Sequence, residues 1–361
     1  MELVKPYAEL WDLPNDELTV KCAQLCYASE VPPKNINDWL EEKWKNGHKS
    51  IFRHATYYYA IPCINVNERL RSFFKYNPYI GYYENDEFVF VSINGQTYRE
   101  HKFIEHLNRY KSSELGLLNL CNTEEDKQEV TKILRKTVFV QTQISTSREL
   151  NRTSPNNICE QSTRYCNFTK EKFDGEVKIC ESWWFLKENN DIVKHYLRAC
   201  EVSTNVYKEL INSGMKPQDA RGVLPLDTAT KVVYTYRIEE WEHILELRYY
   251  GKTGKPHPNA KVSANQIREI LNSVLPKSEY ANCSEDYFPE ASLTFQIMYY
   301  IYIFDYTFSR IYEITIDKEE IENLNNEKIE QYLYKYYHIK AENVSYMTVD
   351  HKLEIEQIEK H

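Results

Sequence analysis

A chain of 361 residues is long enough to bury a sizeable hydrophobic core in one or two domains. Its net charge of −9 argues against a broadly basic surface for nucleic acid or anionic membranes, but it leaves room for one local basic pocket that holds a phosphate. The nine Cys have no repeated spacing, the N-terminus lacks a signal-peptide pattern, and the most apolar stretch, 292–304, is too short to cross a bilayer. We therefore expect a cytoplasmic protein that binds neither membranes nor nucleic acid.

The predicted elements alternate irregularly between helices and strands. Helices are expected over 15–28, 36–45, 191–213, 239–248 and 261–271, with a short helix restarting at Pro217 and an acidic helix over 318–337. Strands are expected over 54–63, 130–143 and 230–237, whereas 66–128 shows little periodicity. Asn15 is the expected cap of the first helix, and Gly47 and Gly214 are the expected ends of two others. This order predicts an α+β fold, a mixed sheet flanked by helices.

The most informative segment is the polar run 147–165, which follows a predicted strand. It contains Arg148, Arg152 and Arg164 together with Glu149 and Glu160. Arginine offers forked, permanently charged donors that suit a phosphate or a carbonyl-rich ring. Composition alone is equally typical of a solvated loop.

The order of residues within this run resembles the signature of flavin-dependent thymidylate synthases. That signature is Arg-His-Arg, seven residues and Ser, with Glu two positions before the Ser and Arg-Tyr shortly after it. Here Arg152 holds the first position, Ser162 keeps the spacing, and the run Glu160-Gln161-Ser162-Thr163-Arg164-Tyr165 follows the pattern. Five further landmarks occur in the family's order, at 23–27, 47–54, 220–225, 241–248 and 257–260.

The resemblance implies a site for each reactant. The implied substrate contacts are Glu149, Arg152, Glu160, Ser162, Arg164, Arg221 and Arg248. The implied flavin contacts are Cys26, His48, Ser50, Arg152, Thr153, Ser154, Glu160, Arg237, Glu239, His243, His257 and Asn259. The cofactor would be FAD, with NADPH and methylenetetrahydrofolate as co-substrates, and the enzyme would be a homotetramer with sites shared between subunits.

Three of these residues also have simpler interpretations. Arg248 matches the family's activating arginine, which stabilises negative charge on uracil, but it is also a cation near a helix C-terminus. Ser162 invites interpretation as a nucleophile, yet no His lies nearby in the sequence, so a substrate contact is favoured. Cys159 is expected to be an inert thiol inside a packed loop. The His residues show no metal-ligand spacing, and no metal is predicted.

The chain also departs from the family's pattern. Thr153 and Ser154 replace the His and Arg of the motif, while Arg53 and Arg237 stand where Glu and Asn are usual. One hypothesis is that the new arginines compensate for the missing charge. Residues 1–275 would form the catalytic domain, with an insertion at about 66–128, and residues 276–361 a C-terminal extension of unknown role.

Three functions remain open at this point. The favoured one is reductive methylation of dUMP to dTMP. The second is methylation or hydroxymethylation of another pyrimidine nucleotide by the same fold, and the third is a catalytically silent nucleotide-binding protein.

Overall fold

The computed structural model describes residues 1–29, 33–152, 157–185 and 190–275, together with the backbone of three strands farther on. The chain forms two compact units, 1–284 and 285–361. In the second unit, β11 (Met298–Asp305) pairs antiparallel with β12 (Arg310–Asp317) and with β13 (Val344–Val349). The expected acidic helix over 318–337 lies outside the described residues.

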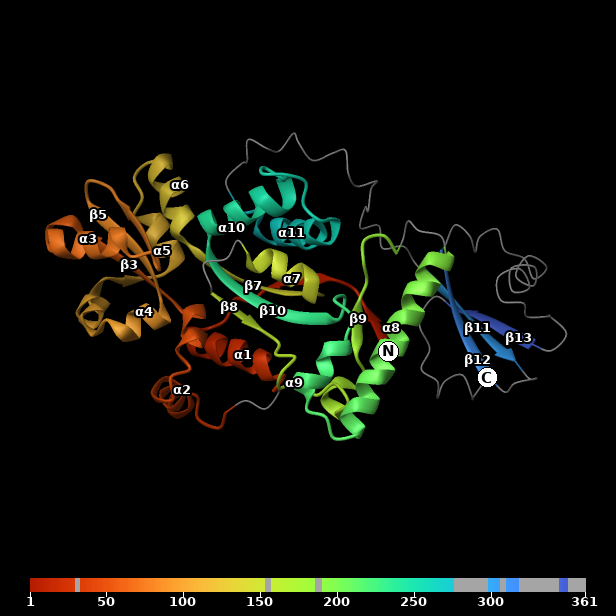
Figure 1. Cartoon of the computed structure of the whole chain (residues 1–361). Coiled ribbons are helices and arrows are strands. Elements are labelled where there is room, and N and C mark those ends of the chain that lie inside the picture. The colour runs from red at the N-terminus through yellow and green to blue at the C-terminus, as the bar shows by residue number, and fades with distance from the viewer. Residues whose placement is uncertain are drawn as a thin grey trace. The chain divides into compact units, whose positions relative to one another are not determined.

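The first unit is built on an antiparallel sheet with the order β2-β7-β10-β8. Its strands are β2 (Tyr7–Leu10), β7 (Arg135–Gln143), β10 (Ala229–Arg237) and β8 (Ile158–Glu160). Hence the α+β prediction is confirmed, with helices on both faces of this central sheet (Figure 1).

Alternating side chains of the central sheet supply two hydrophobic cores. Val138 and Val232 point to one face, which is covered by α7 (Ile144–Asn151), α10 (Ile238–Leu245) and α11 (Pro258–Leu271). Phe139 and Val233 point to the other, where they pack in one cluster with α1 (Asn15–Tyr27) and α2 (Ile36–Lys45). Because neighbouring residues of a strand face opposite sides, the two faces can carry different sites.

A second sheet, with the order β4-β5-β3-β6, occupies the chain between η1 (Lys49–His54) and β7. Its strands are β3 (Thr56–Pro62), β4 (Ile80–Glu84), β5 (Phe88–Asn94) and β6 (Lys111–Ser112). Its helices are α3 (Glu68–Tyr76), α4 (Gly95–Glu100), α5 (Glu114–Asn119) and α6 (Glu124–Ile133). We call residues 56–134 the insert.

The two ends of the insert lie together. The buried Arg135 donates from Nη2 to the carbonyl of Arg53 at 2.6 Å and from Nε to Oγ1 of Thr56 at 3.1 Å. The chain thus enters the insert from η1 beside the point where it returns to the central sheet, as an inserted module requires. The predicted insertion at 66–128 falls within this module, and its status as an insertion relative to the family stays a prediction.

The remaining described elements lie after β8 and at the N-terminus. Two short strands, β1 (Glu2–Val4) and β9 (Lys178–Cys180), pair in parallel. The long helix α8 (Asn190–Asn212) ends before Gly214, whose φ of +93° suits glycine, and the short helix α9 (Pro217–Ala220) follows. No described helix has the length and apolarity to cross a membrane.

Two local predictions were wrong. Asn15 does not cap α1, because Pro14 holds that position. The Asn15 amide instead pairs with the backbone of Thr56 in both directions, at 2.7 and 2.8 Å, which ties α1 to the insert. The strand expected from residue 130 begins only at Arg135, since Val130 and Ile133 are buried in the helix α6.

Candidate functional site

Glu160, at the end of β8, is held by hydrogen bonds from three side chains. Its Oε1 accepts from Ser147 Oγ at 2.7 Å and from Thr230 Oγ1 at 3.0 Å, and its Oε2 accepts from Asn151 Nδ2 at 3.4 Å. Tyr234 fixes Asn151 in turn, through a 2.9 Å hydrogen bond to its Oδ1. A half-buried carboxylate with this support is a preorganised acceptor for the N–H or O–H groups of a ligand.

Arg248 lies in the π-helical turn Glu246–Tyr250, which continues α10. Its Nε donates to the carbonyl of Glu149 at 3.0 Å, and within the described part of the chain it forms no ion pair. A neutral carbonyl, and not a carboxylate, therefore orients this guanidinium. Such π-turns occur often at functional sites.

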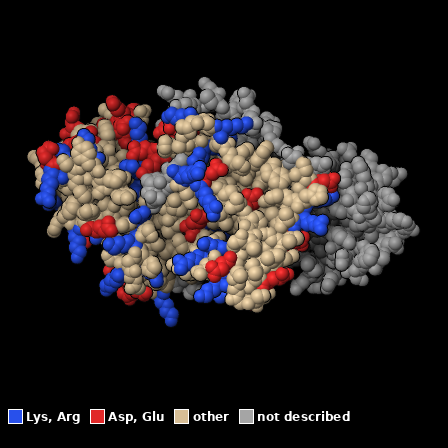
Figure 2. Space-filling model, viewed as in Figure 1, with Lys and Arg blue, Asp and Glu red and all other residues tan. Residues whose placement is uncertain are grey.

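Arg164 and Arg221 converge on one residue of α9. Arg164 Nε donates to the side chain of Gln218 at 3.3 Å, and Arg221 Nε donates to its backbone carbonyl at 3.1 Å. Arg221 also donates to Oγ1 of Thr163 at 2.8 Å. Both side chains are exposed, and neither forms an ion pair with the residues that the structure describes. Figure 2 shows Lys and Arg atoms gathered between α1 and α9 on this face.

Ser162 joins this cluster through its backbone and side chain. Its amide donates to the carbonyl of Cys26 at 2.9 Å, and its Oγ accepts from the amide of Arg164 at 3.2 Å. The hydroxyl thus contacts the backbone of Arg164, and no activating base is among the hydrogen-bond partners of Ser162 in the described chain. The role of Ser162 as a substrate contact stays a prediction.

Two predicted thiols meet beneath the motif. Cys159 is buried in β8 rather than in a loop, and its thiol donates a hydrogen bond to the sulfur of Cys26. This hydrogen bond lowers the pKa of Cys26, and the same bond together with burial raises the pKa of Cys159. Cys26 is therefore the better nucleophile of the pair.

Some of the predicted flavin contacts are exposed, whereas others already form hydrogen bonds or ion pairs within the chain. Arg237 pairs with Glu239 at 3.1 Å and Glu240 at 2.9 Å and donates to the carbonyl of Ile80. Asn259 is buried, and its amide joins the backbone of Trp183 and the hydroxyl of Ser182. In this arrangement, Arg237 and Asn259 are both held by contacts within the chain.

The exposed group can accept a ligand. It consists of His48 and Ser50 at the start of η1, Arg152 at the end of α7, His243 on α10, and His257. His257 also caps α11, since its Nδ1 accepts from the amide of Asn259 at 3.2 Å. Thr153 and Ser154 lie outside the described residues.

The structure thus brings together part of the predicted site. Glu160, Ser162 and Arg164 follow one another at the end of β8, and Arg221 reaches this segment from the turn after α9. Arg248 joins Glu149 on α7, the helix that also holds Glu160. The exposed flavin candidates sit on separate elements. No group of three metal-ligating side chains occurs within the described ranges.

Sequence reasoning missed the residues that orient this site. Ser147, Asn151 and Thr230 support Glu160, while Gln218 gathers the two arginines. Only Ser147 and Asn151 carried a local signal, because residues four apart share one face of a helix.

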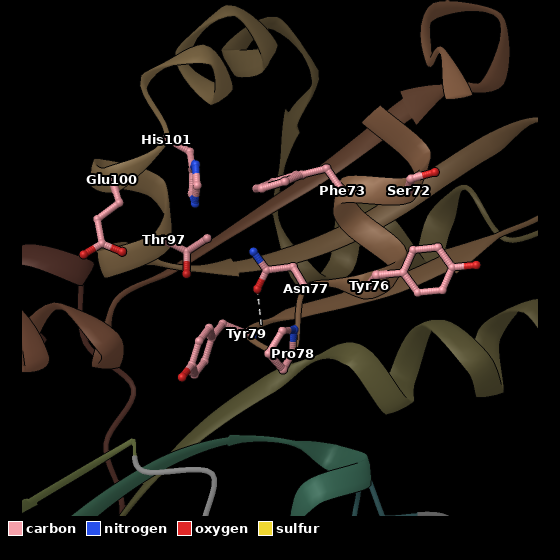
Figure 3. A pocket seen from close by; sticks show the side chains of 9 residues that line it. All are labelled: Ser72, Phe73, Tyr76, Asn77, Pro78, Tyr79, Thr97, Glu100 and His101. Carbon is pink, nitrogen blue, oxygen red and sulfur yellow. Dashed lines mark hydrogen bonds between the residues drawn. The ribbon is translucent and has the colours of Figure 1, made fainter. Parts of the chain in front are cut away.

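A hollow of about 460 Å³ on the insert contains none of the predicted site residues. Figure 3 shows His101 and Thr97 on one side of it, Phe73 and Asn77 on the other, and Tyr79 below. It belongs to α3, α4 and the chain before β4, away from the end of β8.

Comparison with known proteins identifies the family to which the chain belongs. A family profile described as thymidylate synthase complementing protein matches residues 79–277. The flavin-dependent thymidylate synthase of Pyrococcus furiosus is 30% identical over 89 residues, which are 25% of this chain and 35% of that protein. The probable flavin-dependent thymidylate synthase of Paramecium bursaria Chlorella virus 1 is 28% identical over 96 residues, 27% of this chain and 39% of the relative. The chain thus matches little more than a third of the length of these curated relatives.

Among solved structures, the chain is similar to the UMP/dUMP methylase PolB from Streptomyces cacaoi bound with 5-Br dUMP. The TM-score is 0.36 at 17% identity, over 76% of this chain and 94% of the other. Because the family profile covers more than half of the chain, the protein belongs to the thymidylate synthase complementing protein family, that of the flavin-dependent thymidylate synthases.

Proposed function

We propose that this protein is a flavin-dependent thymidylate synthase that converts dUMP to dTMP. Methylenetetrahydrofolate would supply the one-carbon unit, with FAD as the cofactor and NADPH as its reductant. Membership of the family supports a methyltransferase-type enzyme. The choice of dUMP and of the methyl product is our proposal.

The observation that carries the proposal is the convergence of Arg164 and Arg221 on Gln218. Two exposed guanidinium groups without carboxylate partners among the described residues form a site for a doubly charged anion, such as a 5′-phosphate. Ser162 adds its hydroxyl beside Arg164. A nucleotide bound here by its phosphate would extend from this cluster toward Glu160, two residues earlier in the chain.

The rest of the reaction can be assigned to residues that are already oriented. Glu160 would accept hydrogen bonds from the sugar or base, because three side chains hold its carboxylate in place. Arg248 would stabilise the negative charge that develops on the uracil ring when C5 attacks the one-carbon donor. Because the carbonyl of Glu149 already holds the Arg248 guanidinium in place, this cation needs little reorganisation as the reaction proceeds.

A flavin fits this chain only in part. His48, Ser50, Arg152, His243 and His257 are exposed and could hold it, whereas Arg237 and Asn259 are committed to other contacts. When bound, reduced flavin supplies the hydride for the reduction. Because the exposed candidates lie on separate elements, we propose that they complete the site across subunits of a homotetramer.

We also propose a cytoplasmic location. All eight described cysteines are free, and six of them are buried, which suits a reducing compartment.

A second candidate product follows from Thr153 and Ser154. They replace a cation and an aromatic donor of the family's motif, which faces the flavin in the resemblance. A changed flavin environment could shift the enzyme to another pyrimidine nucleotide or to a hydroxymethyl product. The mass of the product distinguishes this candidate from dTMP synthesis.

The test is a mass-spectrometric assay with dUMP, methylenetetrahydrofolate, FAD and NADPH, run in parallel on Arg248→Ala. We expect dTMP from the wild type and at least about a hundredfold less from the variant, the scale seen when one charge-stabilising donor is lost. Bound flavin without dTMP, but with a different methylated or hydroxymethylated nucleotide, would favour the second candidate. If the protein neither bound flavin nor formed any product, it would be a catalytically silent nucleotide binder, and the proposal would be wrong.

A further inference from the structure

A pocket of about 270 Å³ opens on the face of the central sheet that is opposite to Glu160. Thr230 points toward Glu160, whereas the next residue, Lys231, lines the pocket. Gln161, the next residue after Glu160, lines the pocket as well. Since successive residues of a strand face opposite sides, this α1-face pocket lies away from Glu160, and Ser162, Arg164 and Arg221 are not among its lining residues.

The wall of the α1-face pocket includes an ordered aromatic stack. Trp11 and Phe139 lie 5.2 Å apart between ring centroids, with their planes inclined by 15°. The ammonium of Lys21 sits 3.9 Å from the centre of the Trp11 ring. This cation–π contact holds a positive charge at the pocket without neutralising it.

Four lysines and no carboxylate line the pocket, although acidic residues outnumber basic ones in the chain as a whole. Lys172 donates to two backbone carbonyls at the end of α1, and Lys178 pairs with Glu2 and Asp174. Lys21 and Lys231 form no ion pair with the residues that the structure describes. Two uncompensated charges remain for a bound anion.

The uncharged polar lining of the pocket consists of the amides of Gln24, Gln141 and Gln161 together with Ser29. Gln24 and Gln161 stand at the pocket beside the aromatic wall, and an amide both donates and accepts hydrogen bonds. Aromatic rings, amides and ammonium groups together match a planar base joined to a phosphate. The volume lies just below the range of about 300–1,000 Å³ for small-molecule sites, which suits a ligand no larger than a mononucleotide.

We propose that the α1-face pocket binds a 5′-mononucleotide, with its phosphate on Lys21 and Lys231 and its base against the aromatic and amide wall. This second site lies on the face of the sheet that is opposite to Glu160. Occupancy would fix the end of α1, whose carbonyl at Cys26 receives the amide of Ser162. A nucleotide bound here is thus one backbone contact away from the substrate cluster.

Lysine acetylation of the full chain, read by mass spectrometry, tests the location directly. AMP and UMP serve as nucleotide probes, with adenosine and inorganic phosphate as their separate halves. We expect either nucleotide to slow acetylation of Lys21 and Lys231 at least about threefold, while Lys45, an exposed lysine of α2, reacts at an unchanged rate. Equal protection by inorganic phosphate alone, or no protection by either nucleotide, would overturn the proposal.

Affinity measured by calorimetry supplies the second readout. The double variant Lys21→Ala/Lys231→Ala should bind AMP at least about tenfold more weakly than the wild type, and Lys45→Ala should match the wild type. The variant Arg164→Ala/Arg221→Ala should keep AMP binding at the pocket, because neither arginine lines it. Loss of AMP binding in that variant, together with full binding in the lysine variant, would place the nucleotide in the substrate site and reject the second one.

Discussion

The phosphate role of Arg164 and Arg221 can be tested by removing each guanidinium. In the structure, both arginines donate hydrogen bonds to Gln218, and neither forms an ion pair with a carboxylate within the described residues. A hydrogen bond to a charged group contributes about 1.5–3 kcal/mol, and exposure to solvent favours the lower end of that range. Since about 1.4 kcal/mol corresponds to a tenfold change, Arg164→Ala and Arg221→Ala should each weaken dUMP binding by roughly tenfold.

The double variant should lose less than the product of the two single effects. Both arginines share Gln218 and would share one phosphate, and substitutions at residues with a common partner are not additive. Calorimetric titration with dUMP measures each step. The same titration with 2′-deoxyuridine, which lacks the phosphate, should give an affinity that none of the three variants changes.

Arg198→Ala is the matched control, because Arg198 is an exposed arginine of α8 outside this cluster. Its dUMP affinity should equal that of the wild type. If the variants at 164 and 221 weakened deoxyuridine as strongly as dUMP, the two arginines would support the fold of the site and not the phosphate. Unchanged dUMP affinity would remove the main observation behind the proposed function.

Two further predictions concern stability. Burial, reinforced by nearby arginines, lowers the pKa of His54 from 6.5 to about 3, so the folded state binds fewer protons than the unfolded state between these values. The free energy of unfolding should therefore fall as the pH drops below 6.5, by roughly 3 kcal/mol at pH 4.5, and urea titrations should show a shallower fall for His54→Gln. Gly81→Ala would place its Cβ 2.5 Å from Oγ of Ser92 and 2.8 Å from Cβ of Ile133, and should lower the melting temperature through about 1–3 kcal/mol of overpacking. Gly222→Ala, where nothing lies within 4 Å, should leave it nearly unchanged, and equal melting temperatures would refute the packing argument.

Sequence patterns predicted helices best where a capping residue or a glycine marks the helix end. The expected helix 36–45 matches α2, which Asn35 caps and which stops before Gly47 at a φ of +82°. The long helix likewise ends just before Gly214, as predicted. Each signal acts within a few residues, so it is visible without knowing the tertiary structure.

Predictions were weaker where two elements of similar pattern adjoin. The apolar residues Val130 and Ile133 precede β7 directly, so they were assigned to the strand. They belong to α6, which starts with a capping box between Thr123 and Asp126. The helix expected over 239–248 changes to a π-turn at Glu246, and no residue pattern announces that change.

In the candidate site, too, the residues with a signal in the sequence were predicted, and those that depend on the tertiary structure were not. The order of the motif residues indicated Glu160 and Arg248, because this signal lies in residue identity along the chain. The partners that orient them come from distant segments, such as Thr230, which is 70 residues from Glu160, and Gln218, which is 54 residues from Arg164. Their amides and hydroxyls are common surface groups, and only the pairing of β8 with β10 and the position of α9 give them a role.

The two arginines that depart from the family's pattern share a feature that sequence comparison could not show. Arg53 donates to Oε1 of Gln96 at 2.7 Å and lies 5.9 Å from the ring centre of Tyr79, and both partners belong to the insert. Arg237 donates to the carbonyl of Ile80, also in the insert, and its Cδ lies against Gly81.

Arg53 in η1 and Arg237 at the end of β10 thus both contact the insert, which offers them carbonyl and amide acceptors that Glu or Asn would reach less well. The hypothesis that they replace missing charge at the flavin is not needed to explain them. We propose that Arg53 and Arg237 belong with the insert as one adaptation, whereas the role of Thr153 and Ser154 toward a flavin stays a separate prediction.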